Sequence, residues 1–211
     1  MPSAITAAGV VAIARHLGPS RAIEVAEALA AGGIGALELT LNEPEAEALR
    51  AIEAVAIRAP GLGLEIGAGT ILSVEAAGRA VDAGATFLVM PHIDRDLVAW
   101  AVERAIPVIP GCATPTEVLT AWRAGAAAVK LFPASVGGAA FVRELRGPFP
   151  EIPVVPTGGV TLETAPEFIR AGAVAVGLGS WLLGDPSATG ITGRASQIVA
   201  AVATARAELA R

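Results

Sequence analysis

The stretch AWRAGAAAVKLFP, residues 121–133, joins a helix-like segment to an apolar run through the pair Ala-Gly. A glycine just past the end of a helix supplies the left-handed residue that commonly terminates it. The apolar run that follows is typical of a strand buried on both faces, as strands of parallel sheets are. The same pattern recurs at residues 28–41, 80–91 and 168–180. These repeats predict a chain built from βα units.

Extended to the whole chain, the pattern predicts eight strands that alternate with eight helices. The strands are expected at Val10–Arg15, Ala36–Leu41, Glu65–Ile71, Phe87–Pro91, Pro107–Gly111, Ala128–Pro133, Val154–Gly159 and Ala173–Gly179. The helices are expected near residues 20–31, 44–58, 73–83, 94–105, 115–124, 138–146 and 161–171, with a last one at about 192–210. This order predicts an α/β protein with a (β/α)8 TIM barrel, and no linker divides residues 1–211, so we expect a single domain. A doubly wound open sheet is the alternative fold.

The composition narrows the class of protein. The 211 residues are 54% hydrophobic and 17% charged, which favours a folded domain with a sizeable core over a disordered chain. The net charge of −5, without a cluster of basic residues, argues against nucleic acid as a partner. Cys112 is the only cysteine, so no intrachain disulfide can form, and a small buried thiol is expected. Since neither a signal peptide nor a membrane span is evident, we expect a soluble cytoplasmic protein.

A single lysine, Lys130, stands among 14 arginines, inside a predicted strand. Successive side chains of a strand point to opposite faces. The apolar neighbours of Lys130 belong against the outer helices, so Lys130 points into the barrel together with Phe132. The same alternation turns Glu38 and Arg15 inward. These ionisable groups come from three strands and meet near the C-terminal mouth, where barrel enzymes carry their active sites.

Two interpretations of Lys130 follow from this placement. A buried charge is normally paired, so Lys130 and Glu38 could form a structural ion pair. Arginine is the better partner for such a pair, however, and this chain uses arginine at every other cationic position. Only lysine offers an amine that can lose its proton and attack a carbonyl carbon. The sequence therefore favours a catalytic lysine over a structural one.

Two glycine-rich turns indicate a bound anion. PTGGV (156–160) follows the seventh predicted strand, and GLGSWL (177–182) follows the eighth. Exposed N–H groups after these two strands form the phosphate site of many barrels. The turn IGAGTI (66–71) brings Thr70 to the same mouth and suits a carboxylate or carbonyl ligand. Two histidines and no acidic cluster argue against a metal site, so we expect no metal and no cofactor.

Six motifs together resemble those of one enzyme family, and they occur in its order: ELTLN, GAGTIL, PGCATPTE, VKLFPAS, PTGGV and GLGSWL. The resemblance is to the 2-keto-3-deoxy-6-phosphogluconate (KDPG) and 4-hydroxy-2-oxoglutarate (KHG) aldolases. It implies a class I (Schiff-base) aldolase of (β/α)8 fold, usually a homotrimer. The expected reaction cleaves a 2-keto-3-deoxy-6-phospho sugar acid to pyruvate and glyceraldehyde 3-phosphate.

The resemblance also implies roles for individual residues. Lys130 corresponds to the Schiff-base lysine and Glu38 to the base that transfers protons. The contacts to the acid end of the substrate are expected from Thr70 and Arg15. The phosphate contacts are expected from Gly158, Gly179 and Ser180. We add Phe132, on the inward face beside Lys130, and Gly159, in the PTGGV turn, to the expected substrate site.

One departure from the gluconate-type pattern bears on the substrate. Many such members read TLRT where this chain reads TLNEP, so Asn42 replaces an arginine that helps to bind substrate. Together with AIAR, PHI and PGCAT, this favours the branch that acts on 2-dehydro-3-deoxy-6-phosphogalactonate. Two other functions stay open at this point. One is a phosphate-binding barrel enzyme that uses Lys130 and Glu38 for acid–base chemistry without a covalent intermediate, and the other is a non-catalytic binding barrel.

Overall fold

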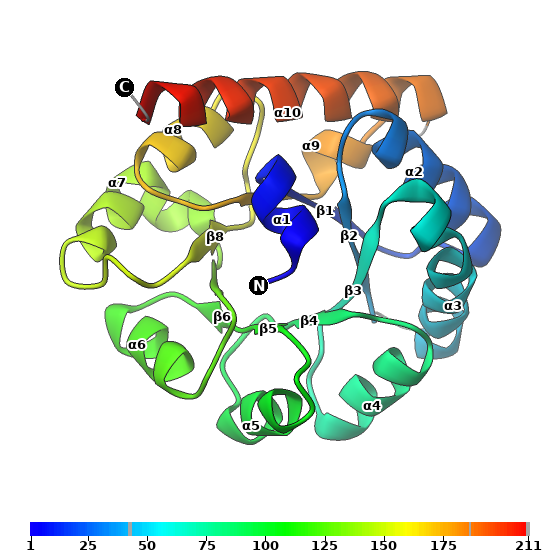
Figure 1. Cartoon of the computed structure of the whole chain (residues 1–211), viewed down its shortest axis with the longest axis horizontal. Coiled ribbons are helices and arrows are strands. Elements are labelled where there is room, and N and C mark those ends of the chain that lie inside the picture. Colours follow the sequence, from blue (N-terminus) through cyan, green and yellow to red (C-terminus); the bar gives the residue numbers. More distant parts are fainter. Residues whose placement is uncertain (42–43, 186, 210–211) are drawn as a thin grey trace.

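The computed structural model describes residues 1–41, 44–185 and 187–209 and has parallel strands surrounded by helices (Figure 1). Every strand pairing in it is parallel. The strands are β1 (Val10–Ala14), β2 (Ala36–Thr40), β3 (Glu65–Gly69), β4 (Phe87–Val89), β5 (Val108–Ile109), β6 (Gly111–Cys112), β7 (Val129–Leu131), β8 (Val154–Pro156) and β9 (Val176–Leu178). The α/β class and the parallel order predicted from the sequence are confirmed.

Helices connect successive strands except β5 and β6, and two further helices were not predicted from the sequence. The helices are α1 (Ser3–Ala8), α2 (Pro19–Ala31), α3 (Glu45–Leu62), α4 (Val74–Asp82), α5 (Arg95–Glu103), α6 (Pro115–Arg123), α7 (Ala134–Arg146), α8 (Ala165–Arg170), α9 (Ser180–Leu183) and α10 (Ala188–Leu209). The two unpredicted helices, α1 and α9, are short. The last helix, α10, was expected at about 192–210 and begins four residues earlier. In the described part of the chain, no helix has both the length and the apolar character to cross a membrane.

The strands divide into two sheets, of order β5-β4-β3-β2-β1-β9 and β6-β7-β8. The single strand predicted over Pro107–Gly111 is therefore wrong. Pro110 separates β5 from β6, because proline has no N–H to donate to a ladder. Backbone hydrogen bonds nevertheless cross the break, from Ala127 N to Val108 O (2.9 Å) and from Lys130 N to Pro110 O (2.8 Å).

The other junction between the sheets lies between β8 and β9. Val174 N donates to Val154 O over 3.0 Å, and Thr157 forms an isolated parallel bridge with Gly177. The two sheets thus contact each other through backbone groups on both sides. In Figure 1 the strands lie around a common centre, with the larger helices outside them.

Two clusters of buried side chains occupy the two faces of the strands. The inner cluster contains Ile5, Val11, Ile13, Ala36, Phe87, Val89, Ile109, Ala128, Val155 and Ala175. The larger outer cluster, between strands and helices, includes Leu37, Leu39, Val129 and Leu131. The predicted alternation is confirmed, since β1 directs its odd-numbered valine and isoleucine inward and β7 directs its apolar residues outward.

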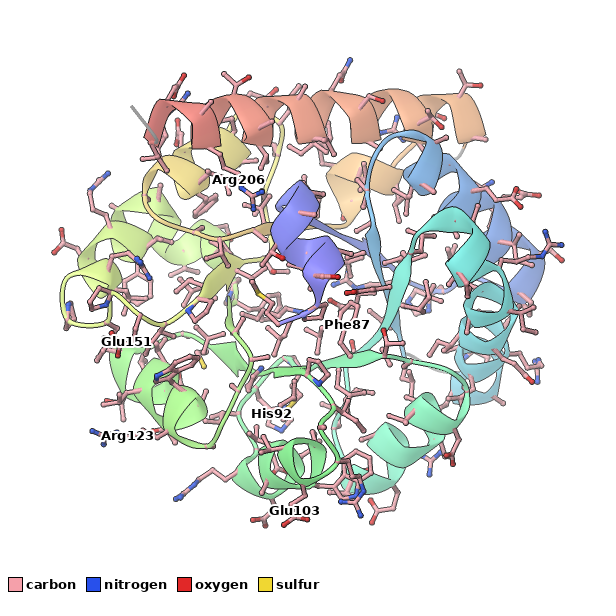
Figure 2. All side chains as sticks on the ribbon, viewed as in Figure 1. Phe87, His92, Glu103, Arg123, Glu151 and Arg206 are labelled. Atoms are coloured by element: carbon pink, nitrogen blue, oxygen red, sulfur yellow. The ribbon has the colours of Figure 1, made fainter. Side chains whose placement is uncertain are left out.

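The α1 helix covers the centre of the ring of strands (Figure 1) and is held there by polar contacts. Ile5, fully buried, belongs to the inner cluster. Ser3 Oγ donates to Glu65 Oε1 over 2.7 Å. Arg206 of α10, labelled in Figure 2, donates to the carbonyls of Thr6 (2.8 Å), Ala7 (3.0 Å) and Val174 (2.6 Å). The N-terminal mouth, where β3 begins, is closed by this helix.

Candidate active site

Lys130 and Glu38 meet in the interior, as their strands predict. Lys130 is the central residue of β7 and Glu38 that of β2, and their side chains are 7% and 2% exposed. The Lys130 Nζ lies 3.9 Å from Glu38 Oε1. It also lies 5.3 Å from the centroid of the Phe132 ring, which brings this third predicted residue beside the amine. The strands thus place an amine and a carboxyl group close together inside an apolar interior.

One oxygen of Glu38 has no hydrogen-bond partner. Its Oε1 is buried and accepts no hydrogen bond, although its residue is almost fully enclosed. Burial raises the pKa of Glu38, and the charges of Lys130 and Arg15 only partly oppose this effect. A buried carboxyl oxygen with spare acceptor capacity and a raised pKa is suited to take up a proton from a ligand.

Thr70 follows β3 directly, in a strained backbone conformation. Its φ is 59°, in the left-handed region that a β-branched residue rarely adopts. Such strain costs on the order of 1–3 kcal/mol and occurs preferentially at functional sites. Thr70 belongs to the same turn as Gly69, at the end of the strand that neighbours β2. This geometry matches the expected position of Thr70 at the mouth.

The two glycine turns and Arg15 line one cavity of about 200 Å³. The described residues that line it include the predicted ligands Arg15, Gly158, Gly159, Gly179 and Ser180. Gly158 (φ 93°) and Gly159 (φ 78°) have backbone conformations that favour glycine. A side chain at Gly179 would approach Arg15 Nη1 to 3.0 Å, so the guanidinium lies against this turn. The cavity therefore combines backbone N–H groups with one cation, which suits an anion.

Thr157 belongs to the site although the sequence did not single it out. It is 4% exposed and lines the anion cavity. It also lines a small internal cavity of about 10 Å³ that contacts Lys130 and Glu38. Its hydroxyl donates a long bond of 3.4 Å to Val155 O. The only signal in the sequence was its place before Gly158 in PTGGV, and threonine is too common in strands to be informative there.

Cys112 is not a nucleophile in this arrangement. The thiol is free and buried, and burial raises its pKa to about 12. A thiol with such a pKa carries almost no thiolate at neutral pH. It lines an apolar cavity of about 190 Å³ on the outer side of β6 and β7, which Phe132 also contacts. The expectation of a small buried thiol is confirmed.

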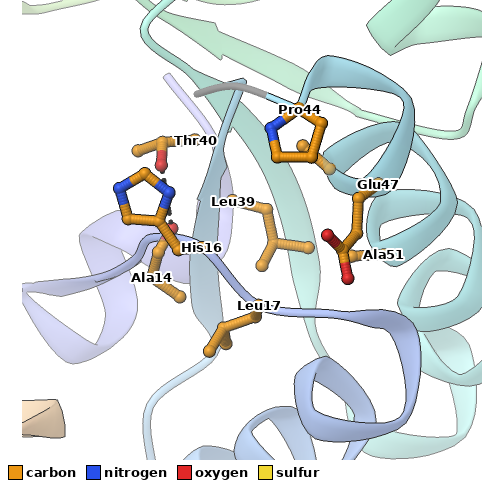
Figure 3. A pocket seen from close by; sticks show the side chains of 9 residues that line it. Ala14, His16, Leu17, Leu39, Thr40, Pro44, Glu47 and Ala51 are labelled. Atoms are coloured by element: carbon orange, nitrogen blue, oxygen red, sulfur yellow. Dashed lines mark hydrogen bonds between the residues drawn. The ribbon is translucent and has the colours of Figure 1, made fainter.

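A further small cavity, of about 60 Å³, lies between the end of β1 and the start of α3 (Figure 3). Next to it, Thr40 Oγ1 donates to Ala14 O over 3.2 Å and joins the ends of β1 and β2. His16 and Glu47 line it from opposite sides. Asn42, the predicted substrate contact, lies outside the described residues. Within the described ranges, no group of three or more His, Cys, Asp or Glu side chains could hold a metal ion.

Comparison with known proteins identifies a family to which this chain is similar. Residues 1–191 match the family model described as KDPG and KHG aldolase. The 2-dehydro-3-deoxy-phosphogluconate aldolase of Pseudomonas aeruginosa is 40% identical over 162 residues, 76% of this chain and 72% of that protein. The 2-dehydro-3-deoxy-6-phosphogalactonate aldolase of Escherichia coli K12 is 38% identical over 171 residues, 81% of this chain and 82% of that protein.

A solved structure adds chemistry to these names. The crystal structure of KDPG aldolase from Legionella pneumophila holds pyruvate captured at low pH as a covalent carbinolamine intermediate. That protein is 30% identical to this chain and superposes with a TM-score of 0.80 over 96% of each chain. The similarity therefore extends over the whole fold as well as over the motifs.

Proposed function

Since the chain belongs to the KDPG and KHG aldolase family, we propose that it is a class I aldolase acting through a Schiff base on Lys130. Its substrate is a phosphorylated 2-keto-3-deoxy sugar acid, and its products are pyruvate and glyceraldehyde 3-phosphate. The observation that carries this proposal is the only lysine of the chain, buried 3.9 Å from a carboxyl oxygen that has no other partner.

The reaction begins with the addition of the neutral Lys130 amine to the C2 ketone, which gives a carbinolamine. Loss of water then gives a protonated imine. This cation accepts the electron pair of the C3–C4 bond when the C4 hydroxyl loses its proton, and glyceraldehyde 3-phosphate leaves. The remaining enamine takes a proton at C3, and hydrolysis of the imine releases pyruvate and restores the amine.

Glu38 is the proposed acceptor and donor of the protons that move in these steps. Support for this role comes from its unpartnered Oε1 and from its raised pKa, which brings the group nearer to the pH at which it must both take and give a proton. General acid–base catalysis of this kind contributes roughly 10²–10⁴-fold to a rate. Thr70 and Phe132 are proposed to contact the pyruvyl part of the substrate.

The cavity lined by both glycine turns is the proposed phosphate site. Its support is the set of N–H groups at Gly158, Gly159, Gly179 and Ser180. Arg15 lines the same cavity, and its charge also acts on the Glu38 carboxyl. We therefore propose that Arg15 binds an anionic group of the substrate from the wall of this cavity.

The closed form of the fold is also an inference. Backbone hydrogen bonds at both junctions of the two sheets support one closed (β/α)8 barrel over a single domain, residues 1–211. A homotrimer, as the family resemblance implies, is the proposed assembly. The cytoplasmic location expected from the sequence stays a prediction.

Trapping with borohydride tests the proposed chemistry. Pyruvate and sodium borohydride together should add one reduced pyruvyl group to the chain, and peptide mass spectrometry should locate it at Lys130. The Lys130→Arg variant is the matched control, because it keeps the charge and only the N-terminal amine can then react. An enzyme restricted to acid–base chemistry, or a non-catalytic binding barrel, would give no adduct at Lys130.

The choice between the two epimers at C4 is a second test, and it rests on the sequence alone. Asn42 cannot make the bidentate anion contact of an arginine but can hydrogen-bond a hydroxyl group. We propose that the 6-phosphogalactonate substrate is cleaved at least as well as the gluconate epimer, and that Asn42→Arg shifts the ratio of kcat/KM values toward gluconate. A strong native preference for the gluconate epimer would contradict this assignment.

A further inference from the structure

The two inward-facing residues in the C-terminal half of strand β3 are both glycines. Its residues alternate, with Ile66 and Ala68 in the outer cluster, so that Gly67 and Gly69 face inward. Neither glycine has a φ in the left-handed region, so the backbone conformation does not require glycine at either position. The reason for these two glycines must therefore be the space above their Cα atoms.

Side chains from the neighbouring strands fill these two spaces. A Cβ atom at Gly67 would lie within 2.6 Å of Cδ2 of Phe87, which comes from β4. A Cβ atom at Gly69 would lie 2.5 Å from Cδ and 2.7 Å from Cγ of Glu38, which comes from β2. Contacts below 3.0 Å do not occur at real Cβ atoms, so one group must move in each case. The ring of Phe87, which is labelled near the centre of Figure 2, thus fills the space at Gly67, and the Glu38 carboxyl fills the space at Gly69.

We propose that Gly69 is a positioning residue for catalysis, which holds the Glu38 carboxyl beside Lys130 by leaving its own side-chain space empty. This inference rests on the proposed function, in which Glu38 moves the protons. Gly69 touches neither the substrate nor the reacting atoms in this role. It acts only by leaving space that the Glu38 side chain occupies.

The two glycines differ in what a substitution would displace. At Gly67 the obstacle is the fully buried Phe87 ring, which is rigid and surrounded by the inner cluster. At Gly69 the obstacle is the far end of a flexible side chain, which can rotate without moving the backbone. The internal cavity beside Glu38 and Lys130 measures only about 10 Å³, so it offers little free space to the displaced carboxyl. Gly69→Ala should therefore move Glu38 more than it disturbs the fold.

The experiment is a double-mutant cycle between positions 69 and 38, with Gly67→Ala as the matched control on the same strand and face. Gly69→Ala should lower kcat by roughly 10-fold or more, up to the loss that Glu38→Ala itself causes. The KM should change by less than about 3-fold, because Glu38 acts on protons rather than on binding. In the Glu38→Ala background, Gly69→Ala should have no further effect on kcat, since its target side chain is gone.

Gly67→Ala should behave differently in the same cycle. Its effect acts on Phe87, so whatever change in kcat it causes should be the same with and without the Glu38 side chain. The pH profile gives a second readout. The acidic limb of kcat, assigned to Glu38, should move in Gly69→Ala and keep its position in Gly67→Ala.

The outcomes separate this inference from the proposed function. If the wild-type protein forms no adduct at Lys130 and cleaves no substrate, the proposed function fails. If the wild type does both, and the effects of Gly69→Ala and Glu38→Ala on kcat simply multiply, Gly69 does not act through Glu38. Should Gly69→Ala alone fail to fold, the double variant Gly69→Ala/Glu38→Ala decides. Recovered folding supports the steric link, and continued failure to fold contradicts it.

Discussion

The polar groups at the two ends of the parallel strands are arranged in opposite ways. At the N-terminal end, Glu65 accepts hydrogen bonds from Ser3 Oγ and, at 3.4 Å, from Ala4 N. Arg206 donates to three backbone carbonyls near the same mouth. Burying or immobilising polar groups is favourable only when they are paired in this way. This end of the molecule is arranged for stability.

At the C-terminal end, two residues are held in energetically unfavourable arrangements. One Glu38 oxygen is buried without a hydrogen-bond partner, and Thr70 has a φ of 59°. Both features cost free energy of folding. The comparison teaches that the buried carboxyl oxygen without a hydrogen bond lies at the C-terminal end, opposite the end where the polar groups are paired. The α1 helix covers the N-terminal end (Figure 1).

The largest effect is expected when the nucleophile at the C-terminal end is exchanged. Lys130→Arg should lower the rate of retro-aldol cleavage by on the order of 10⁴-fold or more, because a guanidinium stays protonated and forms no imine. Stability should change little, since the ionic contact with Glu38 can remain. Steady-state assay of pyruvate release and thermal unfolding measure the two effects. Near-normal activity of this variant would make Lys130 a structural residue and remove the functional contrast between the two ends.

The next effect concerns the unpartnered carboxyl. Glu38→Gln should lower kcat by roughly 10²–10⁴-fold, because the amide cannot accept and return a proton. Burial raises the pKa of Glu38, so the acidic limb of the wild-type profile should lie above the pH at which an exposed glutamate titrates. The limb should be absent in Glu38→Gln. A pH series of kcat measures both, and an unchanged limb would assign the titration to another group.

The same shift in pKa fixes the sign of a pH effect on stability. The folded state binds the Glu38 proton more tightly than the unfolded state does, so protonation of Glu38 stabilises the fold. This contribution is present below the unfolded pKa and is lost as the pH rises through the folded pKa. Urea unfolding across that range should show this loss in the wild type and not in Glu38→Gln.

A smaller effect is expected at the N-terminal end. Arg206→Met keeps much of the apolar stem but removes the donors to three carbonyls, and it should lower the free energy of unfolding by about 1–2 kcal/mol. The control is Arg123→Met, an exposed α6 residue for which the described structure gives no ion pair, and it should change nothing measurable. Denaturant unfolding measures both. A loss of kcat in Arg206→Met without a loss of stability would contradict the assignment of the N-terminal end to stability alone.

How far the sequence could predict this site depends on the kind of geometry involved. Strand alternation has a fixed period of two, so the inward direction of Glu38 and Lys130 followed from their neighbours alone. The two glycine turns could be predicted because each follows a predicted strand of the repeating βα pattern. The alternation of strands and helices was visible in the repeats, whereas the break at Pro110 depends on one missing N–H group.

Features that depend on distant contacts could not be predicted. The α1 helix has six residues, too few to be stable alone. Its partners Glu65 and Arg206 are distant from it in the sequence. The contact of Arg15 with the acid end of the substrate stays a prediction, because alternation does not set the direction of a long side chain beyond its strand. The space shared by Gly69 and Glu38 is likewise a distance between strands, which no local pattern records.

The smallest effect is expected from releasing the strain at Thr70. Thr70→Gly should raise the free energy of unfolding by about 0.5–1 kcal/mol, because glycine adopts a φ of 59° without the steric cost of a β-branched residue. The same variant should lower kcat/KM, since it removes the hydroxyl and loosens the turn that carries it. Thr70→Ala removes the hydroxyl but keeps most of the strain, so it should lose activity without gaining stability. Paired unfolding and kinetic measurements on these two variants separate strain from hydrogen bonding. If Thr70→Gly were less stable than the wild type, the backbone at this end would be held by contacts of the threonine, and the trade of stability for chemistry would be confined to Glu38.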